Sequence, residues 1–277
     1  MKELHRLLWL TDLHLADASS EEFKRFVEDM AVQAADTIAI SGDISDGYHF
    51  VKSLREIHQL LFRKKIYFVL GNHDYYHSSI YDTRKIAENF SEEVLGIEYL
   101  TCSGVHALTE KTAILGHDGW ADGRFGDYYS SKVLLRDFFA IEDFIGISAQ
   151  ERLKKMQLLG DEAVEHFQKY LPEAFQNYER VILVTHVPPF FEACLFKEKL
   201  ADSDWGPFFI CKKVGEVLIE IMEKYSHCKL LVLCGHSHHK AHVKIRQNLS
   251  VLTGGARVEF PEVQELITVD EFSFHAS

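Results

Sequence analysis

Seven side chains that can bind metal ions stand just after short apolar runs of this sequence. They are Asp12, His14, Asp43, Asn72, His186, His236 and His238. Their carboxylate, amide and imidazole groups offer only oxygen and nitrogen donors. Such a set suits Mn²⁺, Fe, Zn²⁺ or Ni²⁺ better than Cu(I) or an all-oxygen Ca²⁺ site. The sequence therefore predicts a divalent metal site assembled from distant parts of the chain.

The five apolar runs that precede these residues are typical of buried β-strands. They cover residues 7–10, 38–40, 66–70, 181–184 and 230–233. Helical patterns separate the first three runs, and strands that alternate with helices predict β-α-β units of an α/β protein. Ligands bind at the carboxyl edge of such sheets. We therefore expect the seven side chains to meet at that edge.

Apolar residues at helical spacing predict five helices. They cover residues 20–35, 50–61, 80–90, 149–170 and 214–225. The end of the sequence is rich in β-formers and predicts a hairpin of residues 242–246 and 249–252 and a closing strand at 265–269. Trp9, inside the first strand, is expected in the core.

The spacing within the motifs suggests how the donors are presented. Asp12 and His14 are two residues apart, as are His236 and His238. Residues two apart on an extended segment share a side, so each pair is expected to project in one direction. Asp43 follows a glycine, which allows the sharp backbone turn that brings a carboxylate close to a metal.

The ordered motifs resemble the metal-binding blocks of the calcineurin-like metallophosphoesterase family. They read Asp12-x-His14, Gly42-Asp43, Gly71-Asn72-His73-Asp74, His186 and Gly235-His236-x-His238. Any one block is common by chance, but five in the family's order are specific. The match runs from residue 7 to residue 238. The resemblance implies an α/β fold, a four-layer αββα sandwich of two mixed β-sheets flanked by helices, and an enzyme that hydrolyses phosphoesters.

The resemblance also implies two metal ions, with Mn²⁺ favoured. One ion would be held by Asp12, His14, Asp43 and His238, and the other by Asp43, Asn72, His186 and His236. Asp43 would bridge them. In such centres the ions lie ~3.5–4 Å apart and clamp both the attacking and the leaving oxygen. A hydroxide formed between the ions would attack phosphorus without a covalent enzyme intermediate.

His73 is implied to act near the leaving group, where it would stabilise or protonate the departing oxygen. Asp46 would accept a hydrogen bond from this imidazole and fix its tautomer, with Asp74 as the alternative partner. Both residues lie in the same motifs as the metal ligands. The simpler interpretation of His73 and Asp46 is a hydrogen-bonded turn.

Two departures from the family pattern bear on the substrate. Protein phosphatases of the family tend to carry an arginine and a glutamate where this chain has Gly47 and Asp74. A small phosphomonoester or phosphodiester, such as a nucleotide, is therefore expected in place of a phosphoprotein. The alternatives are a nucleic-acid phosphodiesterase of the same fold and a catalytically silent binding scaffold.

The composition of the chain indicates which binding partners and which cellular location to expect. The chain of 277 residues has 30 Lys and Arg against 42 Asp and Glu, a net charge of −12, so nucleic acid and anionic membranes are disfavoured. Its five cysteines are odd in number and form no Cys-x-x-Cys pair. They predict reduced thiols and a cytoplasmic protein. No secretory or membrane-spanning segment is recognised. The sequence gives no indication of the oligomeric state.

We expect a single domain over residues 1–277, with a largely helical insertion at about 117–179 and a long aromatic loop at 187–210. The loop aromatics could stack on a base or aryl group, although packing that holds the loop down is the simpler interpretation. The segment His117-Asp118-Gly119-Trp120 also follows a strand. It either faces the metal site or forms a capping turn.

Overall fold

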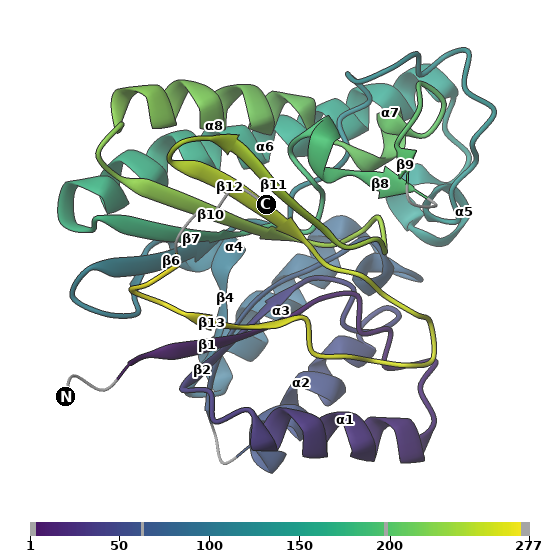
Figure 1. Cartoon of the computed structure of the whole chain (residues 1–277). Helices are drawn as coiled ribbons and strands as arrows, with labels where there is room; N and C mark the ends of the chain where they lie inside the picture. Colours follow the sequence, from purple (N-terminus) through teal and green to yellow (C-terminus); the bar gives the residue numbers. More distant parts are fainter. Residues whose placement is uncertain (1–3, 62–63, 197–198, 273–277) are drawn as a thin grey trace.

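The computed structural model describes residues 4–61, 64–196 and 199–272. Two β-sheets stack face to face in it, and helices cover the outer face of each sheet (Figure 1). Each sheet contains both parallel and antiparallel strand pairs. The predicted α/β fold, a four-layer αββα sandwich, is therefore confirmed.

The first sheet has the strand order β13-β1-β2-β3-β4. Strand β13 is antiparallel to β1, and the other neighbours are parallel. The helices α1, α2 and α3 join and cover its parallel strands (Figure 1). The bounds are β1 Arg6–Leu10, β2 Thr37–Ser41, β3 Lys65–Val69, β4 Ile97–Tyr99, β13 Glu265–Thr268, α1 Ser20–Val32, α2 His49–Leu60 and α3 Ile80–Glu93.

The second sheet has the order β11-β12-β10-β7-β6-β5, and the long helices α6 and α8 cover it (Figure 1). Strands β11 and β12 form the predicted antiparallel hairpin. The bounds are β5 His106–Ala107, β6 Thr112–Gly116, β7 Arg180–Val184, β10 Lys229–Cys234, β11 Ala241–Arg246, β12 Leu249–Thr253, α6 Ala149–Asn177 and α8 Lys212–Lys224.

All five predicted helices are confirmed, with shifted ends. Helix α1 starts where Ser19 caps the backbone N–H of Glu22, and Ser148 and Glu151 form a capping box at the start of α6. Helix α6 continues seven residues beyond the predicted end at residue 170. Short elements complete the chain: α4 Leu100–Ser103, α5 Asp137–Ala140, α7 Gly206–Phe209, the 3₁₀ turns η1 His73–Tyr75, η2 Glu142–Phe144 and η3 Phe191–Ala193, and strands β8 Leu195–Phe196 and β9 Lys199–Leu200.

The central strands β1, β2, β7 and β10 are mostly apolar, because both faces of each sheet are buried there. In β1, Leu7 and Trp9 belong to the cluster between the two sheets, while Leu8 and Leu10 belong to the cluster beneath the helices. This alternation follows from the two-residue period of a strand. Such two-sided burial is typical of strands covered by helices on one face. Trp9 lies in the core, as predicted.

The register of the strands brings their carboxyl ends level. Leu10 pairs with Ile40 and Ile40 with Phe68 in the first sheet, and Leu233 pairs with Val184 in the second. The loops after β1, β2, β3, β7 and β10 therefore leave the sheets at matching heights. These are the five loops that carry the seven predicted ligands.

The segment predicted as a largely helical insertion has two different parts. Residues 117–136 form neither helix nor strand, whereas α6 lies on the second sheet beside α8. The larger core cluster joins residues of α1, α2, α3, α6 and α8, which supports our proposal of a single domain. None of the helices in the described residues is long and apolar enough to span a membrane. All five cysteines are free, and four are buried.

Candidate metal centre

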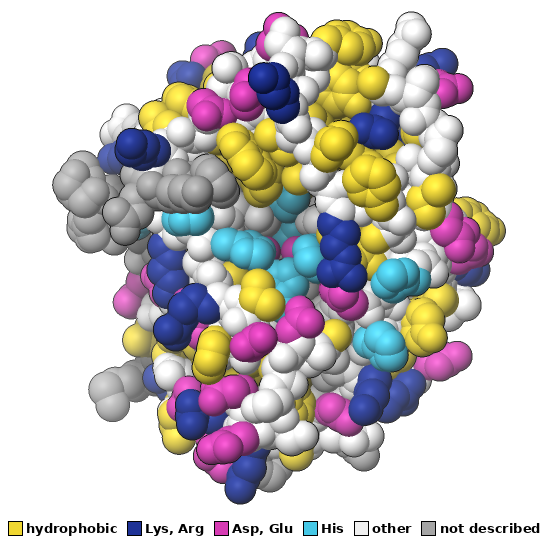
Figure 2. Space-filling view, turned by 90° about the vertical axis from the view of Figure 1, so that its right-hand side faces the viewer, with side chains coloured by type: hydrophobic (Ala, Val, Ile, Leu, Met, Phe, Trp, Pro, Cys, Tyr) yellow, Lys and Arg dark blue, Asp and Glu magenta, His cyan; other side chains and the backbone are white. Residues whose placement is uncertain are grey.

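The seven predicted ligands meet where the carboxyl edges of the two sheets adjoin. The first sheet contributes Asp12, His14, Asp43 and Asn72, and the second contributes His186, His236 and His238. In the space-filling view, histidine side chains gather at the base of a hollow in the surface (Figure 2). Six of the seven residues are buried, and His238 is partly exposed.

Four of these residues form one compact group. Ligand atoms of Asp12, His14, Asp43 and His238 all lie within 4.8 Å of one another. His238 Nε2 is 3.3 Å from Asp12 Oδ1 and 3.2 Å from His14 Nε2. Two imidazole nitrogens and two carboxylates thus converge on one point, as a divalent cation requires.

The other three residues form a second group around the same aspartate. Asp43 Oδ2 lies 3.4 Å from His186 Nε2 and 3.8 Å from His14 Nε2, so it faces both groups. Asn72 Oδ1 is 3.1 Å from His186 Nε2 and 2.9 Å from His236 Nδ1. The arrangement places Asp43 between two sets of nitrogen and oxygen donors.

Five of the seven residues adopt left-handed backbone conformations, which non-glycine residues rarely occupy. Their φ angles are 49° for Asp12, 43° for His14, 49° for Asp43, 68° for His236 and 57° for His238. The prediction that each two-apart pair projects from an extended segment is therefore wrong. The strands end before the ligands, which lie in tight turns. Backbone strain of this kind, about 1–3 kcal/mol a residue, is concentrated at functional sites.

Two glycines allow the carboxylates to approach the turns closely. A Cβ atom at Gly71 would collide with the Asp43 carboxylate, and one at Gly235 would collide with the Asp12 carboxylate. Both glycines directly precede predicted ligands, Asn72 and His236. Close backbone approach, more than turn flexibility, explains the glycine in these two motifs.

Hydrogen bonds orient the donors toward the centre. His186 Nδ1 is 2.8 Å from the Ser41 carbonyl oxygen, and His236 Nε2 is 3.0 Å from that of Phe208. In each ring the other nitrogen faces the cluster. Metal-binding histidines commonly donate their second N–H to such carbonyls, which fixes the tautomer.

Asp137 contacts a predicted ligand, and the sequence analysis missed it. This buried carboxylate accepts hydrogen bonds from Asn72 Nδ2 at 2.9 Å and from the Tyr76 hydroxyl at 2.8 Å. Holding the amide nitrogen turns the Asn72 oxygen toward His186 and His236. Asp137 lies on α5 and carries no motif, so only the three-dimensional structure reveals it.

The electrostatics of the cluster favour bound cations. Burial alone would raise the pKa of Asp12, but the hydrogen bond and charge of His238 lower it to about 2. Burial would lower the pKa of His186, but the Asp43 carboxylate raises it to about 10. The carboxylates thus stay ionised and draw positive charge to themselves. Divalent ions supply that charge while the imidazoles bind as neutral ligands, so the residues fit a metal centre.

His73 lies beside the cluster and contacts the predicted aspartate. Its Nδ1 is 3.0 Å from Asp46 Oδ1, and its backbone N–H donates to Asp43 Oδ1 at 2.8 Å. Burial would lower the pKa of His73, yet the carboxylates of Asp43 and Asp46 raise it to about 9. The alternative partner Asp74 accepts instead from the backbone N–H groups of Ile44, Ser45 and Gly71.

The segment after β6 forms a capping turn and does not present its acid to the centre. Asp118 accepts hydrogen bonds from the backbone of Leu70 and from the hydroxyls of Tyr75 and Tyr99. Trp120 packs against Phe144. Protein donors occupy the Asp118 carboxylate, but Gly119 and Trp120 line a small cavity together with Asn72, His186 and His236. The segment therefore adjoins the centre through these two residues, and Asp118 does not.

The loop at 187–210 is held down by its aromatics, as the simpler interpretation predicts. Phe190 and Phe208 are buried, and Phe191 stacks on Phe125. Phe209 differs, because its ring lies 4.6 Å from that of His236 and lines the cleft beside the centre.

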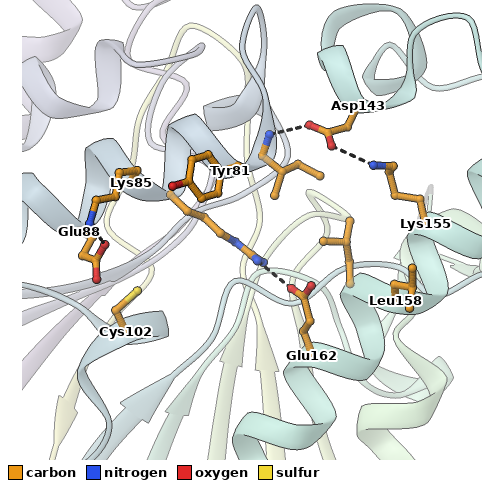
Figure 3. Close-up of a pocket in the computed structure, with 11 residues that line it drawn as sticks. Tyr81, Lys85, Glu88, Cys102, Asp143, Lys155, Leu158 and Glu162 are labelled. Carbon is orange, nitrogen blue, oxygen red and sulfur yellow. Dashed lines mark hydrogen bonds and ion pairs between the residues drawn. The ribbon is translucent and has the colours of Figure 1, made fainter.

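A second cavity, of about 360 Å³, lies between α3, α4 and α6 and contains none of the seven predicted ligands. Its charged side chains pair with one another: Glu162 with Arg84, Lys155 with Asp143, and Lys85 with Glu88 (Figure 3). Chemistry that needs converging metal ligands is thus placed at the sheet edges and not in this cavity.

Two solved structures have a fold similar to that of this chain. The chain resembles a phosphopantetheinyl hydrolase from Mycobacterium tuberculosis, with a TM-score of 0.64, 12% identity, and 95% of this chain and 96% of that chain covered. It also resembles a dimetal phosphatase from Danio rerio, with a TM-score of 0.58, 13% identity, and 91% and 88% covered. At such identities the likeness concerns the fold. A comparison with curated proteins gives no significant match.

The sequence itself decides the family. The family profile described as calcineurin-like phosphoesterase matches residues 5–240, a span that includes all five motifs. Members of this family are dinuclear metal-dependent hydrolases, and the structure contains a candidate metal cluster of His and Asp side chains. The chain is a metallophosphoesterase and belongs to the calcineurin-like phosphoesterase family.

Proposed function

We propose that the protein hydrolyses a small phosphomonoester or phosphodiester, such as a nucleotide, at a centre of two divalent ions, with Mn²⁺ favoured. The observation that carries the proposal is the position of Asp43 Oδ2, which faces His14 on one side and His186 on the other. One carboxylate between two donor groups is the arrangement that a bridged pair of cations needs.

Each ion has its own ligands in this proposal. Asp12, His14, Asp43 and His238 hold the first, and Asp43, Asn72, His186 and His236 hold the second. Bound ions of this kind supply Lewis acidity and lower the pKa of bound water. Asn72 donates a hydrogen bond to Asp137, and His186 and His236 donate to the carbonyl oxygens of Ser41 and Phe208. These bonds hold the ligands in place before the ions arrive.

In this proposal His73 protonates the leaving group, and Asp46 positions His73. Because His73 Nδ1 is bonded to Asp46, the proton available to the substrate sits on Nε2. His73 lines the cleft next to Asp43 and His236, where a departing alkoxide can take that proton. Asp46 is a positioning residue, which fixes the tautomer and stabilises the imidazolium.

We propose a small ester in preference to a nucleic acid. The net charge of −12 repels a polyanion, and Arg136 is the single Lys or Arg among the described residues that line the cleft. We also propose a reducing, cytoplasmic location, which the five unpaired cysteines support.

A paired assay with Mn²⁺ tests the function. It compares p-nitrophenyl phosphate with bis-p-nitrophenyl phosphate and uses Asp43→Asn as the blank. Turnover that the substitution abolishes is expected, and the preferred ester separates monoesterase from diesterase. Equal turnover in the variant would contradict the proposal.

A further inference from the structure

A cleft of about 330 Å³ adjoins the candidate centre. Its lining includes predicted ligands together with residues from three other segments: Asp43, Asn72, His73, Tyr76, Leu135, Arg136, Asp137, Phe209, His236, Ser237, His238 and His239. In the space-filling view, hydrophobic side chains border the hollow that holds the histidines (Figure 2). The cleft therefore combines the metal centre with an apolar border.

Arg136 carries the cationic charge of this lining. Its Nη2 lies 3.5 Å from Asp46 Oδ2, and its guanidinium lies 4.8 Å from the Tyr76 ring centroid. The side chain is 59% exposed, so donors remain for a ligand in the cleft. The next residue, Asp137, is bonded to Asn72. This bond fixes the position of Arg136 relative to the centre.

Leu135 and Phe209 supply the apolar part. Leu135 is half-buried and packs against the main core, and it also lines the cleft. The Phe209 ring lies 4.6 Å from the His236 ring, so an apolar surface begins directly beside a predicted ligand. Leu134, by contrast, is 67% exposed and is not part of the lining.

We propose that the cleft selects esters with one phosphate group and a bulky apolar alcohol. Arg136 binds an oxygen of the phosphoryl group, and Leu135 and Phe209 pack against the alcohol. A second phosphate would find no further Lys or Arg among the described lining residues. This inference rests on the proposed function and adds its substrate class.

Two phosphonates that cannot be hydrolysed test the inference by binding alone. Isothermal titration compares 2-naphthylphosphonate with methylphosphonate on the Mn²⁺-loaded protein. The naphthyl compound is expected to bind at least about tenfold more tightly, because its ring buries apolar surface. Leu135→Ser removes most of that preference, whereas the neighbouring Leu134→Ser, the matched control, keeps it. Arg136→Met weakens both compounds by a similar factor.

The metal content of each variant is measured as a control. If it equals that of the wild type, a change in phosphonate affinity is due to the altered cleft residue. Equal affinity for the two phosphonates in the wild type, or equal losses in Leu134→Ser and Leu135→Ser, would overturn the inference. Selective binding without turnover of any ester would contradict the proposed function and still support the subsite. Turnover with unselective phosphonate binding would refute the subsite alone.

Discussion

Asp43 and Asp118 occupy equivalent places in the two sheets, yet their surroundings differ. Each is buried and lies two residues past the end of a strand, β2 for Asp43 and β6 for Asp118. Five protein donors reach the Asp118 carboxylate: Leu70 N, Arg84 Nε and the hydroxyls of Tyr75, Tyr99 and Thr101. Burial would raise the pKa of Asp118, but Arg84 and His117 hold it below the ordinary value.

Among the described residues, the Asp43 carboxylate meets fewer donors: the backbone N–H of His73 on Oδ1, and the His186 imidazole on Oδ2. Its Oδ2 faces the imidazoles of His14 and His186, which can themselves bind a cation. A buried charge must be compensated. The protein compensates Asp118 with its own hydrogen bonds, whereas in our proposal bound cations replace the imidazole protons that face Asp43.

The largest expected effect follows from removing the open carboxylate. Asp43→Asn should lower turnover with Mn²⁺ by about 10³-fold or more, since several kcal/mol of charge stabilisation are lost. The unfolding of the metal-free protein in urea should change much less than turnover does. Steady-state kinetics and urea titration of the same preparation check both parts. If Asp43→Asn lost turnover because it no longer folded, Asp43 would not differ from Asp118 in the way we describe.

Replacing Asp118, whose carboxylate is hydrogen-bonded within the protein, should lower stability and leave metal binding unchanged. Asp118→Ala leaves Arg84 and two tyrosine hydroxyls buried without their acceptor, so the free energy of unfolding should fall by about 3–5 kcal/mol. Urea unfolding of the metal-free protein measures the loss. The folded fraction should still bind the same number of ions per chain. A variant of normal stability that has lost its metals would place Asp118 in the centre after all.

His73 should contribute a smaller and substrate-dependent factor. His73→Ala is expected to keep its metals and lose about 10²-fold in turnover with poor leaving groups, where protonation matters most. The loss should shrink for p-nitrophenolate, which departs without a proton. Asp46→Asn should follow the same trend more weakly. An equal loss for every leaving group would show that His73 serves binding instead.

Acid should lower the stability of the protein gradually, through the buried histidines near Asp118. Burial lowers the pKa of His117 to about 3 and that of His166 to about 4. As the pH falls, the imidazoles of the unfolded chain bind protons before those of the folded protein. The contribution of these two histidines to the free energy of unfolding is therefore fully present above pH 6.5 and is lost as the pH drops from 6.5 toward 4. Each histidine contributes at most about 1.4 kcal/mol per pH unit.

Urea unfolding of the metal-free protein between pH 7 and pH 4 tests this dependence. His117→Gln should flatten it, while His227→Gln, at an exposed site, should not. Identical slopes for the two variants would contradict a role for burial at His117.

Local apolar patterns were sufficient to predict the five strands that precede the ligands, the hairpin, the closing strand and the five longer helices. The short strands β4, β5, β8 and β9 were not predicted. Neither the left-handed turns at Asp12 and His236 nor the contact of Asp137 with Asn72 could be predicted. Both arise from packing between segments far apart in the chain. The position of Asp118 after a strand was equally visible, yet only its hydrogen-bond partners separate it from Asp43.

Metal content by plasma mass spectrometry tests the central claim most directly. Wild type and Asp43→Asn would be loaded with Mn²⁺, desalted and compared. If Asp43 bridges two ions, the wild type should hold two per chain and the variant should lose occupancy at both positions. Two ions retained in Asp43→Asn would contradict the bridge, and with it the distinction between the open and the satisfied aspartate.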